Sequence, residues 1–76
     1  MQRKSNAERT QATKTALLDA ARALFVEKGF AEASTPQVVQ RAGVTRGALY
    51  HHYPDKAALF LAVVQREAQR VAEHIQ

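Results

Sequence analysis

Four neighbouring residues near the middle of the chain could present hydrogen-bonding groups to a partner from one side of a short helix. At about 100° per residue, the positions that share this outer face are Arg46, Gly47, Tyr50 and His51. The guanidinium of Arg46 can form two hydrogen bonds with guanine O6 and N7, whereas a phenol or an imidazole can bond phosphate oxygens. The missing side chain of Gly47 would let the backbone approach closely. Because no acid interrupts the outer face, it suits an anion-rich partner.

Several polar residues on or near this face admit a second interpretation. Tyr50 could be a packing residue, and His51 could remain in water. His52 lies on the inner side of the predicted helix and could be a hydrogen-bonded structural histidine. Thr35 and Lys56 lie at predicted helix starts, where backbone N–H groups favour an anion. Thr35 caps its helix in either interpretation, and Lys56 could simply be solvated. A metal site at the two adjacent histidines is not expected, because neighbouring helical residues point about 100° apart.

Amphipathic helices must position these groups, and the first is predicted over residues 13–28. Five apolar residues share one face of it: Leu17, Leu18, Ala21, Leu24 and Phe25. Gly29 supplies the left-handed residue that ends a helix, and Phe30 is placed to pack back on Phe25. This helix is therefore expected to stop at Gly29.

A second, short helix follows the sequence Ser34-Thr35-Pro36. A hydroxyl residue, Thr35, is expected to cap it, with Pro36 at the first helical position, where the missing N–H costs nothing. Its inner face is formed by Val38, Val39 and Ala42. Gly43 is expected to end it after about two turns, because glycine enters positive φ freely.

A third helix is predicted over residues 46–52, capped by Thr45 and closed by Pro54, which disfavours helical geometry in the residue before it. Asp55 caps a fourth helix that starts directly after it. Two amphipathic helices joined by a short glycine-containing turn are the outline of a helix-turn-helix. The predicted fold is all-α, a three-helix helix-turn-helix head of the homeodomain-like kind plus the start of a fourth connecting helix.

Composition and charge narrow the class of protein. The chain has 76 residues, no cysteine and a formal net charge of +4, so it lacks a disulfide framework and a thiolate metal site. No apolar run is long enough to span a membrane.

The chain is expected to divide into a basic flexible arm over 1–12, a helix-turn-helix domain over 13–54 with its motif at about 34–53, and the fourth helix over 55–76. No acid–base pair or phosphate-binding glycine loop is found, so neither an enzyme nor a cofactor is expected.

The run from Thr35 to Lys56 resembles the TetR family of bacterial transcriptional regulators, through Ala-Gly-Val-Thr followed by Leu-Tyr, an aromatic residue and Lys. The segments 20–25 and 28–30 are also similar to the first helix of that family. The resemblance implies that the third helix enters the major groove of DNA. It also implies that the fourth helix leads to a larger regulatory and dimerisation domain that is absent here.

Carried residue by residue, the resemblance implies two kinds of DNA contact. Phosphate contacts are expected from Thr35, Thr45, Tyr50 and Lys56, and base or groove contacts from Arg46, Gly47 and His51. The histidine at the position of His52 touches phosphate in some members.

Two positions depart from the family pattern. Val39 replaces a preferred Ala, which could widen the spacing of the second and third helices, and Tyr53 replaces Phe, which adds a hydroxyl that needs water or a partner.

The apolar stripe of the fourth helix changes direction along its length. Its first part, with Leu59, Phe60 and Val63, is expected to pack on the first two helices. A second stripe, with Ala68, Val71, Ala72 and Ile75, finds no cover in these residues. We therefore expect it to meet a regulatory domain or a second subunit.

The function expected from the sequence is sequence-specific binding to double-stranded DNA, as the reading head of a ligand-responsive repressor. The resemblance further implies a homodimer on a palindromic operator, a small-molecule effector in the missing C-terminal domain, and a cytoplasmic, nucleoid-associated bacterial protein. The alternative is a helical protein-interaction module whose basic surface binds an acidic partner.

Overall fold

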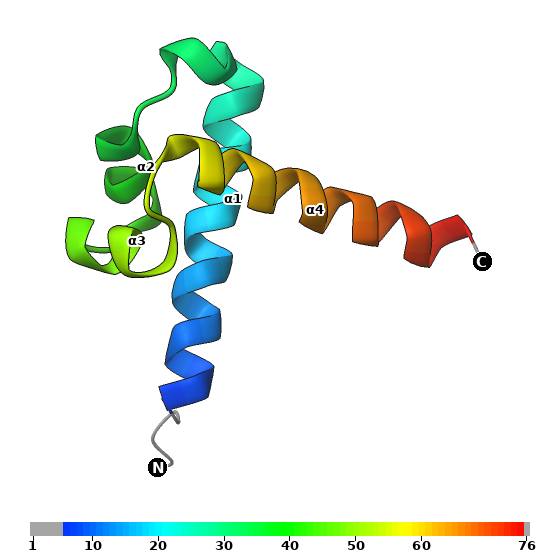
Figure 1. Cartoon of the computed structure of the whole chain (residues 1–76), viewed down its shortest axis with the longest axis horizontal. Coiled ribbons are helices and arrows are strands. Elements are labelled where there is room, and N and C mark those ends of the chain that lie inside the picture. Colours follow the sequence, from blue (N-terminus) through cyan, green and yellow to red (C-terminus); the bar gives the residue numbers. More distant parts are fainter. Residues whose placement is uncertain (1–5, 76) are drawn as a thin grey trace.

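Four helices form the part of the chain that the computed structural model describes, residues 6–75, with side chains described up to residue 73. They are α1 (Asn6–Glu32), α2 (Thr35–Ala42), α3 (Arg46–His52) and α4 (Lys56–Ile75). The short helices α2 and α3 lie beside α1, and α4 leaves this head steeply inclined to α1 (Figure 1). The predicted all-α head with a fourth helix is confirmed.

The first helix starts earlier than predicted. Residues 6–12, expected to belong to a flexible arm, form the first turns of α1, whereas residues 1–5 lie outside the described residues. This part of α1 has no apolar face, so hydrophobic periodicity could not reveal it. Its alanine, glutamate, arginine and glutamine residues are nevertheless good helix formers, and Glu8 lies favourably in the first turn.

The predicted break at Gly29 is confirmed. Its φ of 82° and ψ of 165° interrupt the helical geometry within α1, in a region of backbone space open essentially to glycine alone. One further turn follows, and the Ala33 N–H donates to the Gly29 carbonyl at 3.1 Å. The Phe25 and Phe30 rings stack with their centroids 5.7 Å apart, as expected from their spacing.

The cap of α2 is Ser34, not Thr35 as predicted. The Ser34 hydroxyl accepts from the Gln37 N–H at 3.3 Å, and the Gln37 side chain accepts from the Ser34 N–H at 3.0 Å. This reciprocal capping box selects Ser34, because Gln37 stands three residues after it. Pro36 therefore occupies the second helical position. The predicted end of α2 is confirmed, with Gly43 left-handed at φ 71°.

The predicted bounds of α3 and start of α4 are confirmed. The Thr45 hydroxyl accepts from the Ala48 N–H at 3.0 Å, and α3 ends where the Tyr53 N–H donates to the Leu49 carbonyl at 2.8 Å. The Asp55 carboxylate accepts from the Ala58 N–H at 2.8 Å and so caps α4. Local backbone and capping contacts thus set both ends of α3 and the start of α4.

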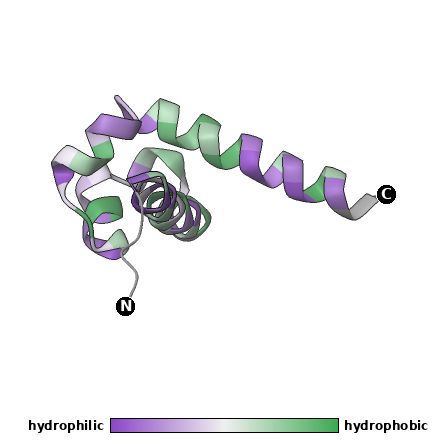
Figure 2. Cartoon of the chain, turned by 90° about the horizontal axis from the view of Figure 1, so that it is seen from below, coloured by the Kyte–Doolittle hydropathy of each residue, from purple (hydrophilic) through white to green (hydrophobic). Residues whose placement is uncertain are grey.

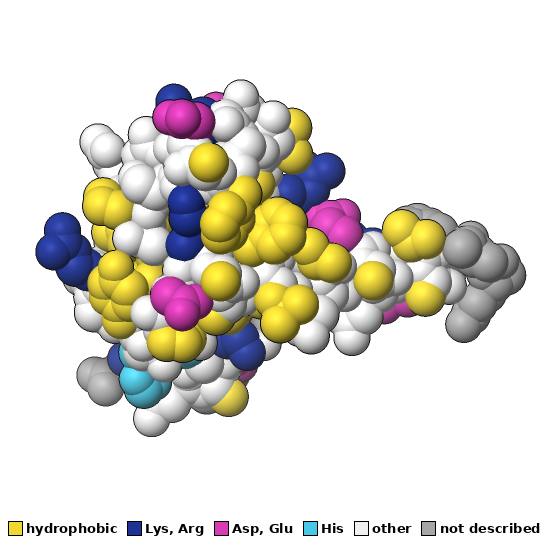
Figure 3. Space-filling view, turned by 45° about the horizontal axis from the view of Figure 1, so that its top comes forward, with side chains coloured by type: hydrophobic (Ala, Val, Ile, Leu, Met, Phe, Trp, Pro, Cys, Tyr) yellow, Lys and Arg dark blue, Asp and Glu magenta, His cyan; other side chains and the backbone are white. Residues whose placement is uncertain are grey.

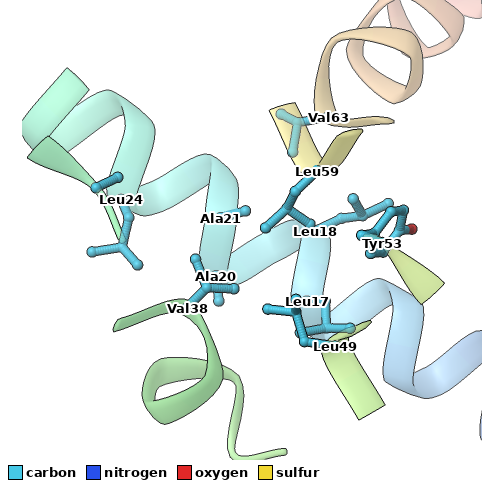
Figure 4. Packing of buried hydrophobic residues seen from close by; sticks show 11 residues of the cluster. Leu17, Leu18, Ala20, Ala21, Leu24, Val38, Leu49, Tyr53, Leu59 and Val63 are labelled. Carbon is cyan, nitrogen blue, oxygen red and sulfur yellow. The ribbon is translucent and has the colours of Figure 1, made fainter. Parts of the chain in front are cut away.

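One apolar cluster holds the four helices together (Figure 4). Its largest fully buried side chains are Leu17, Val38, Leu49 and Leu59, which come from α1, α2, α3 and α4 respectively. Within residues 6–73, no polar or charged residue is buried. Every helix therefore depends on this shared core, and α3, with seven residues, is far too short to be stable alone.

The packing of α4 differs from the prediction in one respect. It rests chiefly on α1 rather than on both α1 and α2. Phe60 packs on α1 as predicted: its ring centroid lies 5.3 Å from that of Phe25 and 5.2 Å from that of Phe30, both in edge-on geometry, and the residue stays 41% exposed. This three-ring cluster stands at the edge of the core, where α1 ends and α4 begins.

Ion pairs join the helices across the head. Arg41 of α2 donates to both carboxylate oxygens of Glu27 of α1, at 2.7 and 3.2 Å, which lowers the pKa of that carboxyl. Arg66 of α4 donates to Asp19 of α1 at 2.8 Å. Because Arg66 lies on the side of α4 that faces α1, this contact helps to fix how α4 leaves the head.

The outer part of α4 extends beyond the head with alternating hydrophilic and hydrophobic residues (Figure 2). Val71 is 56% exposed, and Ala68 and Ala72 are exposed as well, so the predicted second stripe has no cover for these residues. The Ile75 side chain lies outside the described residues. No helix among residues 6–75 has the length and hydropathy required to cross a bilayer.

Candidate nucleic-acid interface

The third helix divides into an inner and an outer face as predicted. Leu49 is fully buried, whereas Arg46, Gly47 and His51 are exposed and Tyr50 is 45% exposed. Arg46 forms no hydrogen bond or ion pair with any residue that the structure describes, so its guanidinium can meet a partner with all its donors. The outer face of α3 therefore presents the groups expected from the sequence.

A pair of hydroxyls links α2 to this outer face. The Thr35 Oγ1 and Tyr50 hydroxyl oxygens lie 3.1 Å apart, and either group can donate. This hydroxyl pair explains why Thr35 is not the cap: its side chain points to α3 while Ser34 closes the helix. Tyr50 is therefore half-exposed at the surface and bonded to α2, and it is not a core residue.

The hydroxyl pair borders an open cleft of about 420 Å³. The cleft is lined by the end of α1, the start of α2 and the start of α4, including Pro36, Pro54 and Asp55. The N–H of Thr35 belongs to the first turn of α2 and has no partner within its own helix. Thr35 and Tyr50 both line the cleft, and whichever hydroxyl does not donate within the pair keeps a proton that could be donated to a phosphate oxygen.

Lys56 lies at the same cleft, but its ammonium is directed into the protein. Its Nζ donates to the carbonyls of Phe30 at 2.6 Å, Ala33 at 3.0 Å and Ala31 at 3.4 Å. It also lies 4.3 Å from the centroid of the Phe30 ring. The side chain is therefore not simply solvated, and its donors are already taken.

The two adjacent histidines have different environments. His51 is exposed, whereas His52 is half-buried, with the ring centroids 5.0 Å apart. Burial, followed by the charges of His51 and Lys14, lowers the pKa of His52. Within the described residues His52 has no side-chain hydrogen bond, so it is not the hydrogen-bonded structural histidine considered above.

Among residues 6–73, no three His, Cys, Asp or Glu side chains gather closely enough to hold a metal ion. The Thr45 hydroxyl, which caps α3, lies exposed at the end of the outer face.

The two departures from the family pattern are accommodated in the core. Val39 is half-buried and packs against the core cluster beside Ala42. Tyr53 is 8% exposed, and its burial raises the pKa of the hydroxyl despite the opposing charge of Arg66. Among the described residues, the structure gives this hydroxyl no hydrogen-bond partner.

Comparison with known proteins places the chain among bacterial regulators. Residues 17–63 match the model of the bacterial regulatory proteins of the tetR family. The HTH-type transcriptional repressor Rv1474c of Mycobacterium tuberculosis is 41% identical over 56 residues, which cover 74% of this chain and 30% of that protein. The HTH-type transcriptional regulator UidR of Escherichia coli K12 is 38% identical over 60 residues, covering 79% and 31%.

A solved structure shows the same arrangement of helices. The crystal structure of a TetR-family transcriptional regulator from Pectobacterium atrosepticum superposes with a TM-score of 0.76 and 39% identity, covering 93% of this chain and 36% of that one. The chain thus spans about a third of the length of the relatives that it matches. The family match covers the core helices and the whole of the helix-turn-helix. The chain belongs to the TetR family of bacterial regulatory proteins.

Proposed function

We propose that the chain binds double-stranded DNA with α3 in the major groove, as the reading head of a transcriptional repressor. The observation that carries this proposal is the acid-free outer face of α3, which stands beside the hydroxyl pair of Thr35 and Tyr50. A helix fits the major groove, where base edges carry a unique pattern of donors and acceptors. The relatives named as transcriptional repressors and regulators support this function over binding to an acidic protein.

Two groups of residues have different roles in this proposal. Phosphate contacts from Thr35, Thr45, Tyr50 and His52 set affinity and the position of the head on the duplex. Base or groove contacts come from Arg46, Gly47 and His51, with Arg46 suited to a guanine. Thr45 can serve both as cap and as contact, because its hydroxyl accepts from Ala48 and keeps its own proton to donate.

The remainder of the repressor is proposed to follow α4. The matched segment makes up only about 30% of the relatives' length, and the side chains of Val26, Leu61, Val64 and Val71 are between 45% and 74% exposed. Apolar side chains also gather on the face of the head and α4 seen in Figure 3. We propose that residues 55–76 connect the head to a regulatory domain that covers such surface, forms the homodimer and binds a small-molecule effector. Such a repressor would act on the bacterial nucleoid, in the cytoplasm.

A selection of bound sequences from random duplex DNA tests the proposal. The expected result is enrichment of one motif, and a palindrome if two heads bind together, with half-sites about one helical turn or a multiple apart. Recovery of no motif, with binding that disappears uniformly at moderate salt, would contradict sequence-specific recognition.

A further inference from the structure

The start of α4 is tied to the connection between α1 and α2 through one side chain. An ammonium has three donors and no acceptor, and Lys56 meets three backbone carbonyls, those of Phe30, Ala31 and Ala33. These carbonyls belong to the last turn of α1 and the residue after it, where helical partners run out. The cation over the Phe30 ring adds a further attraction. The carbonyls therefore match the three donors of Lys56 in number.

The segment held by Lys56 leads directly into the proposed phosphate site. Ala33 precedes Ser34, whose capping box fixes the first turn of α2, and Thr35 follows at once. Thr35 in turn bonds Tyr50 on α3 at 3.1 Å. An unbroken series of contacts therefore runs from α4 through Lys56 and Ala33 to the hydroxyl pair.

We propose that Lys56 is a positioning residue rather than a phosphate contact. It holds the connection over residues 30–33 so that the hydroxyl pair is in place for phosphate. This proposal rests on the proposed function, because it concerns the same DNA surface.

Two substitutions separate positioning from phosphate contact. Arginine binds phosphate at least as well as lysine, but its planar fork does not match three carbonyls that converge on a single nitrogen. Positioning predicts that Lys56→Arg and Lys56→Met both weaken binding to the selected duplex, on the order of tenfold, with the salt dependence unchanged. A phosphate contact predicts that Lys56→Arg binds normally and that Lys56→Met lowers the log-log salt slope by about 0.9.

A double-mutant cycle separates positioning from a general loss of stability. Thr35→Val removes one partner of the hydroxyl pair, so the effect of Lys56→Met on DNA affinity should shrink in its presence. Circular dichroism checks that each variant folds, and measurements are made below its unfolding transition. Lys28→Met is the matched control, because it removes an exposed lysine of α1 that has no such carbonyl contacts.

Hydrogen exchange gives a readout that needs no DNA. Lys56→Met should speed exchange at the amides of Ala33 and Ser34 more than at those of the core of α1. The positioning role is overturned by normal DNA binding of Lys56→Arg, by a salt slope lowered by about one, or by unchanged exchange at Ala33 and Ser34. If the wild-type chain binds no DNA with sequence preference, the proposed function fails, and hydrogen exchange still reports whether Lys56 orders the connection.

Discussion

The substitution Leu49→Ala tests how α3 is held in place. Leu49 is fully buried and shares the core cluster with Leu17 of α1. Replacing a buried leucine by alanine costs about 2–5 kcal/mol, because transfer energy is lost and a cavity remains. A domain of 76 residues has a total stability of about 4–11 kcal/mol. The variant should therefore lose a large part of its stability.

Thermal unfolding followed by circular dichroism measures this loss. For a chain of this size, each kcal/mol shifts the midpoint by about 4–8 °C, so Leu49→Ala should lower it by at least about 8 °C. The matched control is Leu61→Ala on α4, where the leucine is 56% exposed and the change should stay within about 0.5 kcal/mol. Equal losses for the two variants would refute the placement of α3 against the core.

Three further predictions concern caps, glycines and pH. Ser34→Ala should destabilise the chain by about 0.5–2 kcal/mol in urea unfolding, and more than Thr35→Ala, because Ser34 is the cap; the reverse order would contradict the capping box. Gly43→Ala should cost about 1–2 kcal/mol of stability, because Gly43 has a left-handed φ. Gly47→Ala meets no close contact and should stabilise α3 by about 0.5–1 kcal/mol, yet weaken DNA binding. Improved DNA binding by Gly47→Ala would contradict a place for Gly47 in the interface. The pKa of His52 is lowered on folding, so the unfolded chain binds more protons, and the free energy of unfolding falls as pH drops through 6.5. In His52→Gln, the free energy of unfolding should depend less steeply on pH, and an unchanged dependence would contradict the prediction.

The features predicted correctly are those set by local chemistry. The break at Gly29, the end of α2 at Gly43 and the cap at Thr45 each depend on a residue and its near neighbours in the chain. The inner and outer faces of α3 follow from helical periodicity alone. These elements could be predicted because the rule and the residues it concerns lie within one or two turns.

The errors arise where the local sequence pattern is missing or fits two residues equally well. Residues 6–12 have helix-forming composition without an apolar face, so periodicity alone placed the start of α1 too late in the chain. Two hydroxyl residues precede Pro36, and only the reciprocal bond with Gln37 distinguishes Ser34 as the cap. The pattern of a capping box, Ser34 followed three residues later by Gln37, is present in the sequence and identifies this cap.

The contacts at the cleft could not be predicted, because they join distant parts of the chain. Thr35 and Tyr50 are 15 residues apart, and Lys56 bonds carbonyls 23 to 26 residues before it. Backbone carbonyls leave no signature in a sequence. The family resemblance supplied the residue types of the site, whereas the directions of their side chains required the fold.

The central claim is that Arg46 on the outer face of α3 reads a base pair. The most direct test compares Arg46→Ala with the control Arg70→Ala, since Arg70 is half-exposed on the outer part of α4 and away from the outer face. Fluorescence anisotropy is measured on the selected duplex and on a shuffled duplex at the same salt. The expected loss for Arg46→Ala is about 1–3 kcal/mol on the selected duplex, with little loss on the shuffled one and a relaxed preference at one base pair. Equal losses on both duplexes, or equal effects of the two arginine variants, would contradict the account.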